Sequence, residues 1–305
     1  KQRGYSIMKK ASSNALVIAK ILRKLRLKNA SERFNAQRHE RIRESLSGIF
    51  EKAYRNMPDN FPQLDGNSNR YVWVFWWQGE DQMPELVKKC YQSLKRQLYD
   101  KKIVLITKDN IKEYCSFPQY IFDKCESGKI TLTHLSDILR FDLLSHYGGL
   151  YTDATVFWTR NIPSLTFSEL YTCGGYPDVY YFNVAKGRWT GFLIGGDKDN
   201  PLFTFMYGFF LKYWEQYDEL IDYFLIDYAL DFAYEKNIGG FKDYADKEAV
   251  YNNPKLFELM EVRNKKFTME GEKAMMSKTC AFKLSYKKNF SSAKNTYANQ
   301  IIFKK

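Results

Sequence analysis

The middle of the chain alternates between short apolar runs and longer segments whose apolar residues lie three or four positions apart. The first pattern predicts buried strands and the second predicts helices. The predicted strands cover residues 71–77, 103–107, 129–132 and 150–158, and the predicted helices cover residues 84–98, 118–125 and 134–147. This alternation favours a three-layer α/β domain with a largely parallel sheet. In such sheets, ligands bind beyond the carboxyl ends of the strands.

Residues 15–28 have a different pattern, which predicts a helix with one apolar side. The apolar side holds Ile18, Ile21, Leu22 and Leu25, and the rest holds Lys20, Arg23, Lys24 and Lys28. Such a helix gains apolar burial and electrostatic attraction at an anionic membrane, so we interpret it as a membrane-surface helix. The alternatives are a helix packed on its own domain or on a partner, and a nucleic-acid-binding arm. The scarcity of aromatic residues for base stacking argues against nucleic acid.

Most of the net charge of +12 belongs to the N-terminal part of the 305-residue chain. Residues 1–43 contain 13 Lys or Arg and two acidic residues, so the remainder is nearly neutral. A loop-like segment rich in Pro, Asn, Asp and Gly follows at residues 56–70. We therefore expect a basic helical, membrane-associating extension over residues 1–55 and a catalytic domain over residues 68–305.

The cysteine and histidine content excludes several classes of site. Five scattered cysteines without a C-x-x-C pair fit neither a disulfide framework nor a zinc site, and three histidines give little material for metal or Ser-His-Asp chemistry. No apolar run approaches the ~20 residues of a membrane-spanning helix. Basic residues interrupt the N-terminal apolar stretch, which therefore does not resemble a signal peptide. We expect a cytoplasmic protein attached peripherally to the inner face of the cell membrane.

The segment from Ser136 to Thr155 holds charged residues in apolar surroundings. Its helix is apolar nearly all round, yet Asp137 and Arg140 lie three positions apart on one face. Burying such charges costs several kcal/mol unless they are paired or bind something. A simple ion pair within the helix is the structural alternative.

The strand after Gly148-Gly149 adds a further carboxylate. Side chains alternate in a strand, so Tyr151, Asp153 and Thr155 are expected on one face. A carboxylate at the strand's exit suits a divalent cation that neutralises a diphosphate leaving group. The chain has neither a G-x-x-x-x-G-K-[ST] loop nor a G-x-G-x-x-G loop. A metal and an arginine would then replace the backbone amides of those loops.

The pattern S-D-x-x-R, seven residues and G-G-x-Y-x-D-x-T resembles the sugar-donor signature of the DXD-containing glycosyltransferases, which include the Och1-like mannosyltransferases and the glucosylating clostridial toxins. The bacterial capsular polysaccharide synthesis glycosyltransferases are the most similar group. Trp76-Trp77-Gln78-Gly79 resembles the end of their first strand, Asp153-Ala154-Thr155 resembles their D-A-T variant of DXD, and residues 223–228 resemble a later helix. The resemblance covers residues 70–290.

The resemblance implies a GT-A-like three-layer fold with a mixed, mainly parallel sheet, and transfer with retention of anomeric configuration. It implies a UDP-hexose donor, UDP-galactose or UDP-glucose, and a divalent cation, Mn²⁺ or Mg²⁺. The implied acceptor is a growing glycan, oligosaccharide or polyprenyl-diphosphate-linked, in capsular or cell-surface polysaccharide synthesis. No nucleic-acid partner is expected.

The resemblance also implies roles for the nucleotide-binding residues. Trp76 or Trp77 would stack on the nucleobase, next to Gln78, and Tyr151 would flank the ribose. Ser136 would hydrogen-bond nearby.

For the reacting part of the donor, the resemblance implies that Asp137 holds sugar hydroxyls and that Arg140 contacts the sugar or the diphosphate. Asp153 would bind the metal and touch the donor. The second metal position is Thr155 and not Asp, so one carboxylate is missing and metal dependence is in question.

Four other residues are candidates with structural alternatives. Trp189 and Asp227 are candidates for the acceptor side, where Asp227 would help to deprotonate the acceptor hydroxyl. Lys283 and Lys287 are candidates for closing over the diphosphate as point charges, and a solvated basic tail is the alternative.

Three rival functions stay open at this stage. A nucleic-acid-binding protein would use residues 1–43, but it leaves Asp137, Arg140 and Asp153 unexplained. Thr155 allows a protein that binds a nucleotide sugar without turnover. A glycoside hydrolase would use paired carboxylates, but an arginine beside them suits a diphosphate leaving group better.

Overall fold

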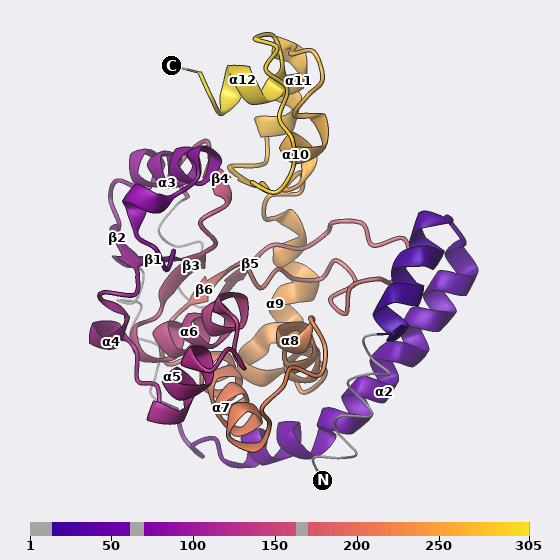
Figure 1. The fold of residues 1–305 in the computed structure, drawn as a ribbon, viewed down its shortest axis with the longest axis vertical. Helices are drawn as coiled ribbons and strands as arrows, with labels where there is room; N and C mark the ends of the chain where they lie inside the picture. The colour runs from indigo at the N-terminus through magenta and orange to yellow at the C-terminus, as the bar shows by residue number, and fades with distance from the viewer. Residues whose placement is uncertain (1–13, 62–69, 163–169, 305) are drawn as a thin grey trace.

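A central five-stranded sheet organises the protein in the computed structural model, which describes residues 14–61, 70–162 and 170–304 (Figure 1). The strand order is β2-β1-β3-β6-β5. The strands are β1 (Tyr71–Phe75), β2 (Lys102–Ile106), β3 (Gly149–Thr152), β5 (Leu170–Thr172) and β6 (Leu193–Gly196). β1 is parallel to β2 and β3, whereas β6 is antiparallel to β3 and β5.

The sheet is therefore mixed, and the prediction of a mainly parallel sheet was wrong for its β6–β5 half. A parallel neighbour requires a crossover connection, usually a helix. The described residues between β3 and β5, and those between β5 and β6, contain no helix. The GT-A assignment itself stays a prediction.

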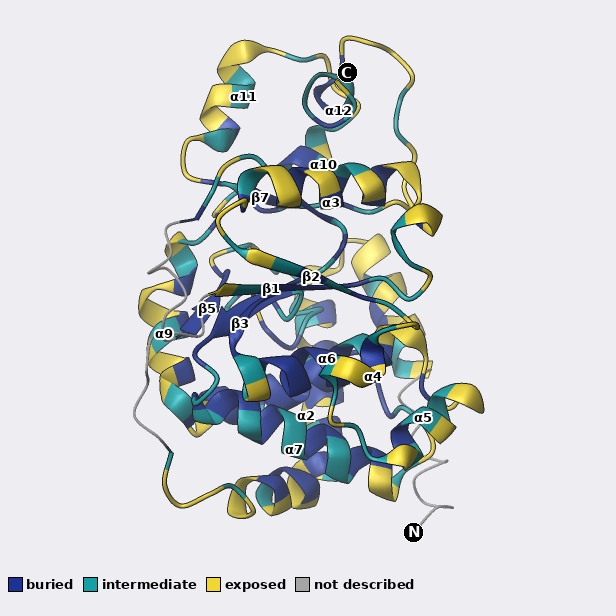
Figure 2. Cartoon of the chain, turned by 90° about the vertical axis from the view of Figure 1, so that its left-hand side faces the viewer, coloured by how far each residue is buried: buried dark blue, intermediate teal, exposed yellow. Residues whose placement is uncertain are grey.

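Helices cover both faces of the sheet (Figure 2). α3 (Glu85–Gln97) lies on one face, and α6 (Leu132–Tyr147) and α7 (Pro201–Gln216) lie on the other. β1 explains how the layers form: Val72 and Val74 pack in the cluster with α3, whereas Trp73 and Phe75 pack in the cluster with α6 and α7. This alternation is what a strand buried on both faces requires.

The long helix α2 (Lys28–Arg55) packs on α7 and on α8 (Leu225–Glu235). Its buried apolar residues, Ile42, Leu46, Ile49, Phe50 and Ala53, belong to the main core. Two buried polar contacts fasten it: Arg38 pairs with Asp222 at 2.5 Å, and His39 Nδ1 lies 2.7 Å from the Tyr228 hydroxyl. Residues 28–55 are thus part of the main core, while the domain boundary expected near residue 55 stays a prediction.

The N-terminal helix buries Ala19 and packs Leu16 on the main core, but it leaves much of its predicted apolar side exposed. The helix covers residues 14–24 and is followed by a turn before α2. Ile18 and Ile21 are 45% and 50% exposed, Leu22 is partly buried, and Leu25, which lies in the turn, is 62% exposed. None of the described helices has the length and apolar character needed to cross a bilayer.

Two predicted strands differ in the structure. Residues 129–132 form no strand, because the Thr131 side chain accepts a hydrogen bond from the His134 amide and caps α6 instead. The predicted strand 150–158 is two strands, β3 and β4 (Val156–Trp158), which belong to different sheets. The chain turns between them, where the Val156 amide donates to the Asp153 carbonyl at 3.0 Å.

The C-terminal part forms a smaller lobe next to α3 (Figure 1). Its strand β7 (Ala281–Lys283) pairs antiparallel with β4. The remaining elements are α4 (Ile111–Tyr114), α5 (Gln119–Glu126), α9 (Phe241–Lys247), α10 (Glu258–Val262), α11 (Met269–Met276), α12 (Tyr297–Ile301) and three short 3-10 turns at Glu80–Gln82, Ile238–Gly240 and Ala249–Tyr251. Pairing of β4 with β7 brings segments about 125 positions apart into contact.

Candidate functional site

A cleft of about 480 Å³ lies at the carboxyl ends of β1 and β3. Because these strands are parallel, the residues that follow them emerge at the same edge of the sheet. The cleft is lined by Phe75, Trp76, Trp77, Gln78, Gln82, Pro84, Leu132, Thr133, Ser136, Tyr151, Asp153, Ala154, Thr155 and Tyr286. The site is therefore at the edge where an α/β sheet is expected to bind a ligand.

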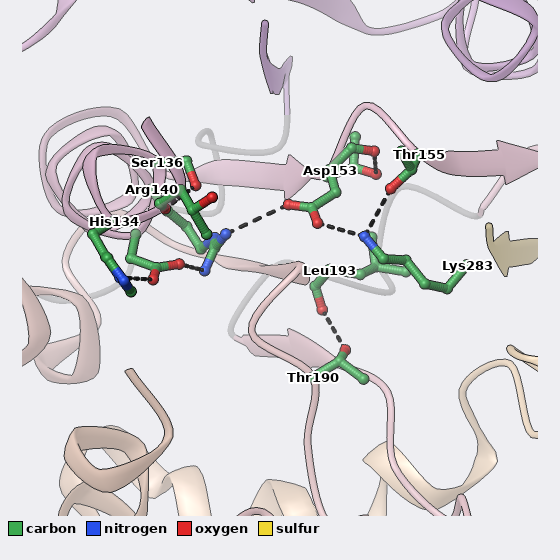
Figure 3. A network of polar contacts seen from close by, with 11 residues as sticks. His134, Ser136, Arg140, Asp153, Thr155, Thr190, Leu193 and Lys283 are labelled. Carbon is green, nitrogen blue, oxygen red and sulfur yellow. Dashed lines mark hydrogen bonds and ion pairs between the residues drawn. The ribbon is translucent and has the colours of Figure 1, made fainter. Parts of the chain in front are cut away.

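Arg140 joins Asp137 and Asp153 beside this cleft, and Figure 3 shows Arg140 directed toward Asp153. Arg140 Nη1 lies 2.9 Å from Asp137 Oδ1, and Arg140 Nη2 lies 3.5 Å from Asp153 Oδ1. The first pair follows from the three-residue spacing on α6. The second follows from the return of the chain through Gly148-Gly149 into β3. The charges predicted from sequence thus form one cluster.

Arg140 is held rigidly behind the cleft. Its guanidinium lies 4.5 Å from the centre of the Tyr151 ring, and the residue is only 3% exposed. Burial lowers the pKa of Arg140, but the charges of Asp137, Tyr151 and Asp153 raise it, and the net shift is upward. Its Nε is buried and has no hydrogen-bond partner among the described residues. Arg140 is therefore a fixed positive charge.

The three charged residues differ in access to the cleft. The Asp153 side chain is 30% exposed and lines the cleft, whereas Asp137 is 8% exposed and, like Arg140, does not line it. His134 Nδ1 lies 3.6 Å from Asp137 on the side away from Arg140. Asp137 reaches Asp153 only through Arg140, which contacts both carboxylates. The expected contact of Asp137 and Arg140 with the donor stays a prediction.

Lys283 approaches Asp153 from the other side (Figure 3). Its Nζ lies 2.5 Å from Asp153 Oδ2 and 2.8 Å from Thr155 Oγ1. Lys283 is the last residue of β7, so it does not belong to a solvated tail. Lys287, by contrast, is exposed, does not line the cleft, and lies near the ring of Tyr286 at 6.0 Å.

The two residues expected to bind a metal are thus both engaged by an ammonium group. Asp153 supplies the one carboxylate at this position, and Thr155 supplies a hydroxyl. Within residues 14–61, 70–162 and 170–304, no group of three or more His, Cys, Asp or Glu side chains is arranged to hold a metal ion. The donor set does not fit a divalent cation held by the protein alone.

Aromatic rings form the other end of the cleft. Trp76 and Trp77 follow β1 and are partly buried, and Gln78 is exposed in the turn that leads to Gly79. The Trp76 ring packs against the edge of Tyr286 with centroids 5.9 Å apart. The flat, partly accessible indoles provide stacking surfaces of the kind a nucleobase uses.

Asp227 and Trp189 lie deeper than expected. Trp189 is fully buried and donates a hydrogen bond from its Nε1 to Asp227 Oδ1 at 3.0 Å, so it has no surface for an acceptor. Burial raises the pKa of Asp227 to about 7; the bond from Trp189 opposes this shift, and the charge of Asp137 adds to it. Asp227 therefore lies within electrostatic reach of the cluster but does not line the cleft.

Ser136 lines the cleft, where its hydroxyl donates to the Thr133 carbonyl at 2.6 Å. This bond uses the hydroxyl proton locally and leaves the oxygen lone pairs as acceptors for a ligand hydroxyl.

A protein-family model matches the part of the chain that contains this cleft. The profile of the family described as capsular polysaccharide synthesis protein matches residues 22–301, nearly the whole chain and every residue of the site. The chain belongs to this family. The match begins before α2, in accord with the place of α2 in the main core.

One curated relative is similar to about a third of the chain. It is the O-glycosyltransferase braB of Annulohypoxylon truncatum, which is 27% identical over 112 residues. The aligned part is 34% of this chain and 27% of the relative, so the chain spans about a quarter of the relative's length.

Several residues at the site were not predicted from the sequence, and two of them contact predicted site residues. Tyr286 lies between the two named lysines of the C-terminal segment, and a cluster of aromatic and basic residues there was the available signal. Phe192, whose ring centre lies 4.5 Å from Lys283 Nζ, carries no sequence signal, because its place depends on how β6 enters the sheet.

A second hollow of about 500 Å³ lies between α2 and α8. Its central charges are paired with one another, since Asp231 lies 2.6 Å from both Arg43 and Arg188. This pairing fastens α2 to α8 and accounts for these charges structurally.

Proposed function

We propose that this capsular polysaccharide synthesis protein is a glycosyltransferase that moves a hexose from a UDP-hexose, UDP-galactose or UDP-glucose, to a glycan acceptor. Two comparisons support the class: the family is one of capsular polysaccharide synthesis, and the relative is described as an O-glycosyltransferase. The observation that carries the proposal is Asp153, an accessible carboxylate at the end of β3 with a fixed cation on each side.

The arrangement suits a substrate that has a sugar at one end and a charged leaving group at the other. In our proposal, Trp76 or Trp77 stacks on the uracil and Tyr151 supports the ribose side. Asp153 accepts hydrogen bonds from sugar hydroxyls, since a carboxylate accepts at both oxygens. The adjacent positive charges stabilise the diphosphate as negative charge develops on it.

We further propose a front-face displacement with retention. The bond between C1 of the hexose and the diphosphate oxygen breaks, and its electron pair stays on UDP. The acceptor oxygen forms a bond to C1 from the same face, and its proton passes to the departing diphosphate. Among the described residues that line the cleft, Asp153 is the one carboxylate, and both of its oxygens are engaged. An inverted product anomer in NMR spectra would contradict this mechanism.

The acceptor in this proposal is a glycan on a polyprenyl-diphosphate lipid at the inner face of the cell membrane. The exposed apolar residues of helix 14–24 support it, because basic residues accompany them along the same helix. Apolar burial together with attraction to anionic lipid would hold the enzyme where such an acceptor is displayed.

Donor binding and turnover test the proposal. A UDP-hexose is expected to raise the melting temperature more than GDP- or dTDP-sugars do, because a ligand that binds only the native state stabilises it. Asp153→Asn should reduce release of UDP from the donor by at least about 100-fold, within the range for loss of a transition-state contact. Asp59→Asn, a change to an exposed carboxylate outside the cleft, should leave the rate unchanged. Equal rates for both variants would refute the proposal, and binding without any turnover would favour a non-catalytic sugar-binding protein.

A further inference from the structure

The position of Lys283 is set by the backbone and does not depend on a flexible tail. β7 pairs with β4 so that Lys283 lies opposite Val156, immediately after Thr155. The Lys283 amide donates to the Leu256 carbonyl, and the next amide, that of Leu284, donates to the Thr155 carbonyl at 2.9 Å. The strand register therefore directs the Lys283 side chain to the turn that carries Asp153.

The ammonium group occupies the place where the two expected ligands converge. Lys283 Nζ is within 2.8 Å of oxygens from both Asp153 and Thr155, and the Phe192 ring lies on a further side. A divalent cation bound to the same two oxygens would lie within a few ångströms of the ammonium. Repulsion between like charges at that separation is several kcal/mol outside bulk water. A metal ion could bind only after the ammonium had left.

Thr155, the residue that departs from the DXD pattern, suits an ammonium group at this position. An aspartate at position 155 would give a metal a second carboxylate, but a hydroxyl is a suitable neutral acceptor for an ammonium that already faces one carboxylate. An ammonium donates three hydrogen bonds, and Asp153 and Thr155 accept two of them. The third remains for a ligand oxygen, and the Lys283 side chain is 21% exposed beside the cleft.

We propose that Lys283 takes the place of the divalent cation, so that the donor diphosphate is bound and stabilised by its ammonium and no metal ion is required. This inference rests on the proposed function, since it needs a diphosphate ligand in the cleft. It replaces the expectation that Mn²⁺ or Mg²⁺ is held at Asp153 and Thr155. Lys283 supplies a point charge of the kind that lysines offer to phosphates in other sites.

Calorimetric titration with UDP, on protein treated with EDTA and on protein supplied with Mn²⁺, tests the inference. We expect Kd in EDTA to lie within about threefold of Kd in Mn²⁺. Lys283→Met should weaken UDP binding in EDTA by at least tenfold, in the range for a lost charge-assisted hydrogen bond. Lys278→Met, which removes an exposed lysine just before β7, should not change Kd.

A double variant, Lys283→Ala with Thr155→Asp, provides a gain-of-dependence test. It removes the ammonium and restores the second carboxylate, so its UDP binding should become dependent on Mn²⁺. UDP binding by the wild-type protein that disappears in EDTA and returns with Mn²⁺ would overturn the inference and leave the proposed function intact. An absence of UDP binding in both conditions would overturn the proposed function itself. The wild-type comparison needs no variant, so a folding defect in Lys283→Met leaves the test decisive.

Discussion

At the scale of single residues, the site is a chain of alternating charges. Asp137, Arg140, Asp153 and Lys283 follow one another, and each carboxylate contacts a cation. The first three were predicted as a group, because charged residues in an apolar segment need partners. Lys283 was a sequence candidate for the diphosphate, but its contact with Asp153 was not predicted, since it depends on the pairing of two strands about 125 positions apart. The depth of Trp189 was also not predictable, because an aromatic residue in a Gly-rich segment suits a surface or a core equally well.

Asp227 gives a pH prediction at this scale. Its pKa is raised by burial from 3.8 to about 7, so the folded state binds a proton that the unfolded state releases near pH 4. The stabilisation from this proton is full at low pH and is lost as the pH rises through 7. A shift of three units corresponds to about 4 kcal/mol, and the partial exposure of the residue reduces our expectation to about 2 kcal/mol.

The measurement is urea unfolding of the wild-type protein and Asp227→Asn at pH 5 and pH 8. Asparagine does not ionise, so the free energy of unfolding of the wild-type protein should fall by about 2 kcal/mol relative to the variant between these pH values. Asp59→Asn, at an exposed site, should show no such difference. A constant offset between wild type and Asp227→Asn would show that Asp227 ionises normally in the folded protein.

At the scale of elements, local signals predicted most of the helices and strands near the site. Tyr71–Phe75 and Lys102–Ile106 are strands, and α3, α5 and α6 lie within two residues of their predicted bounds. One strand prediction failed where pairing with a distant segment of the chain decided the structure. The sequence of residues 150–158 predicts one continuous strand. Its second half, β4, pairs with β7 instead of continuing β3. The turn between β3 and β4 places Asp153 and Thr155 in the cleft.

Gly149, the first residue of β3, provides a test of how β3 positions the site. It has φ +94°, and a Cβ there would lie 2.4 Å from the Tyr71 carbonyl oxygen of the neighbouring strand. Gly149→Ala should therefore force β1 and β3 apart, destabilise the fold by about 2 kcal/mol or more, and weaken donor binding. Chemical denaturation and UDP titration measure the two effects.

The matched control is Gly48→Ala in α2, where a Cβ meets nothing within 4 Å. Replacing a helical glycine by alanine should stabilise the protein by up to about 1 kcal/mol. Equal effects of the two substitutions would mean that the close approach of β3 to β1 is not required.

At the scale of the whole molecule, α2 lies within the range that the family model matches, and its apolar residues pack in the main core. Helix 14–24 packs on the body through Leu16 and Ala19, and leaves Ile18 and Ile21 about half exposed. The charge distribution predicted this surface from the sequence, whereas the packing of α2 was not predicted, because its apolar residues are diluted by polar ones.

Sedimentation with lipid vesicles tests this surface. The protein should bind vesicles that contain anionic lipid, and raised salt should weaken the binding. Ile18→Asn with Ile21→Asn should reduce vesicle binding about tenfold or more, because two buried side chains are each worth more than 1 kcal/mol. Tyr99→Asn removes an exposed apolar residue outside this helix and should have no effect. Equal binding to neutral vesicles, or binding unaffected by the double variant, would contradict the proposal.

The pairing of β4 with β7 has a consequence for biosynthesis. During translation, Asp153 leaves the ribosome long before Lys283 is made, so the nascent chain carries a carboxylate with only Arg140 beside it. Lys283, the second cation beside Asp153, takes its place only when β7 has paired with β4. If the proposed role of Lys283 holds, the capacity to bind a diphosphate is acquired late, and polypeptides that stop short of β7 would be made without it.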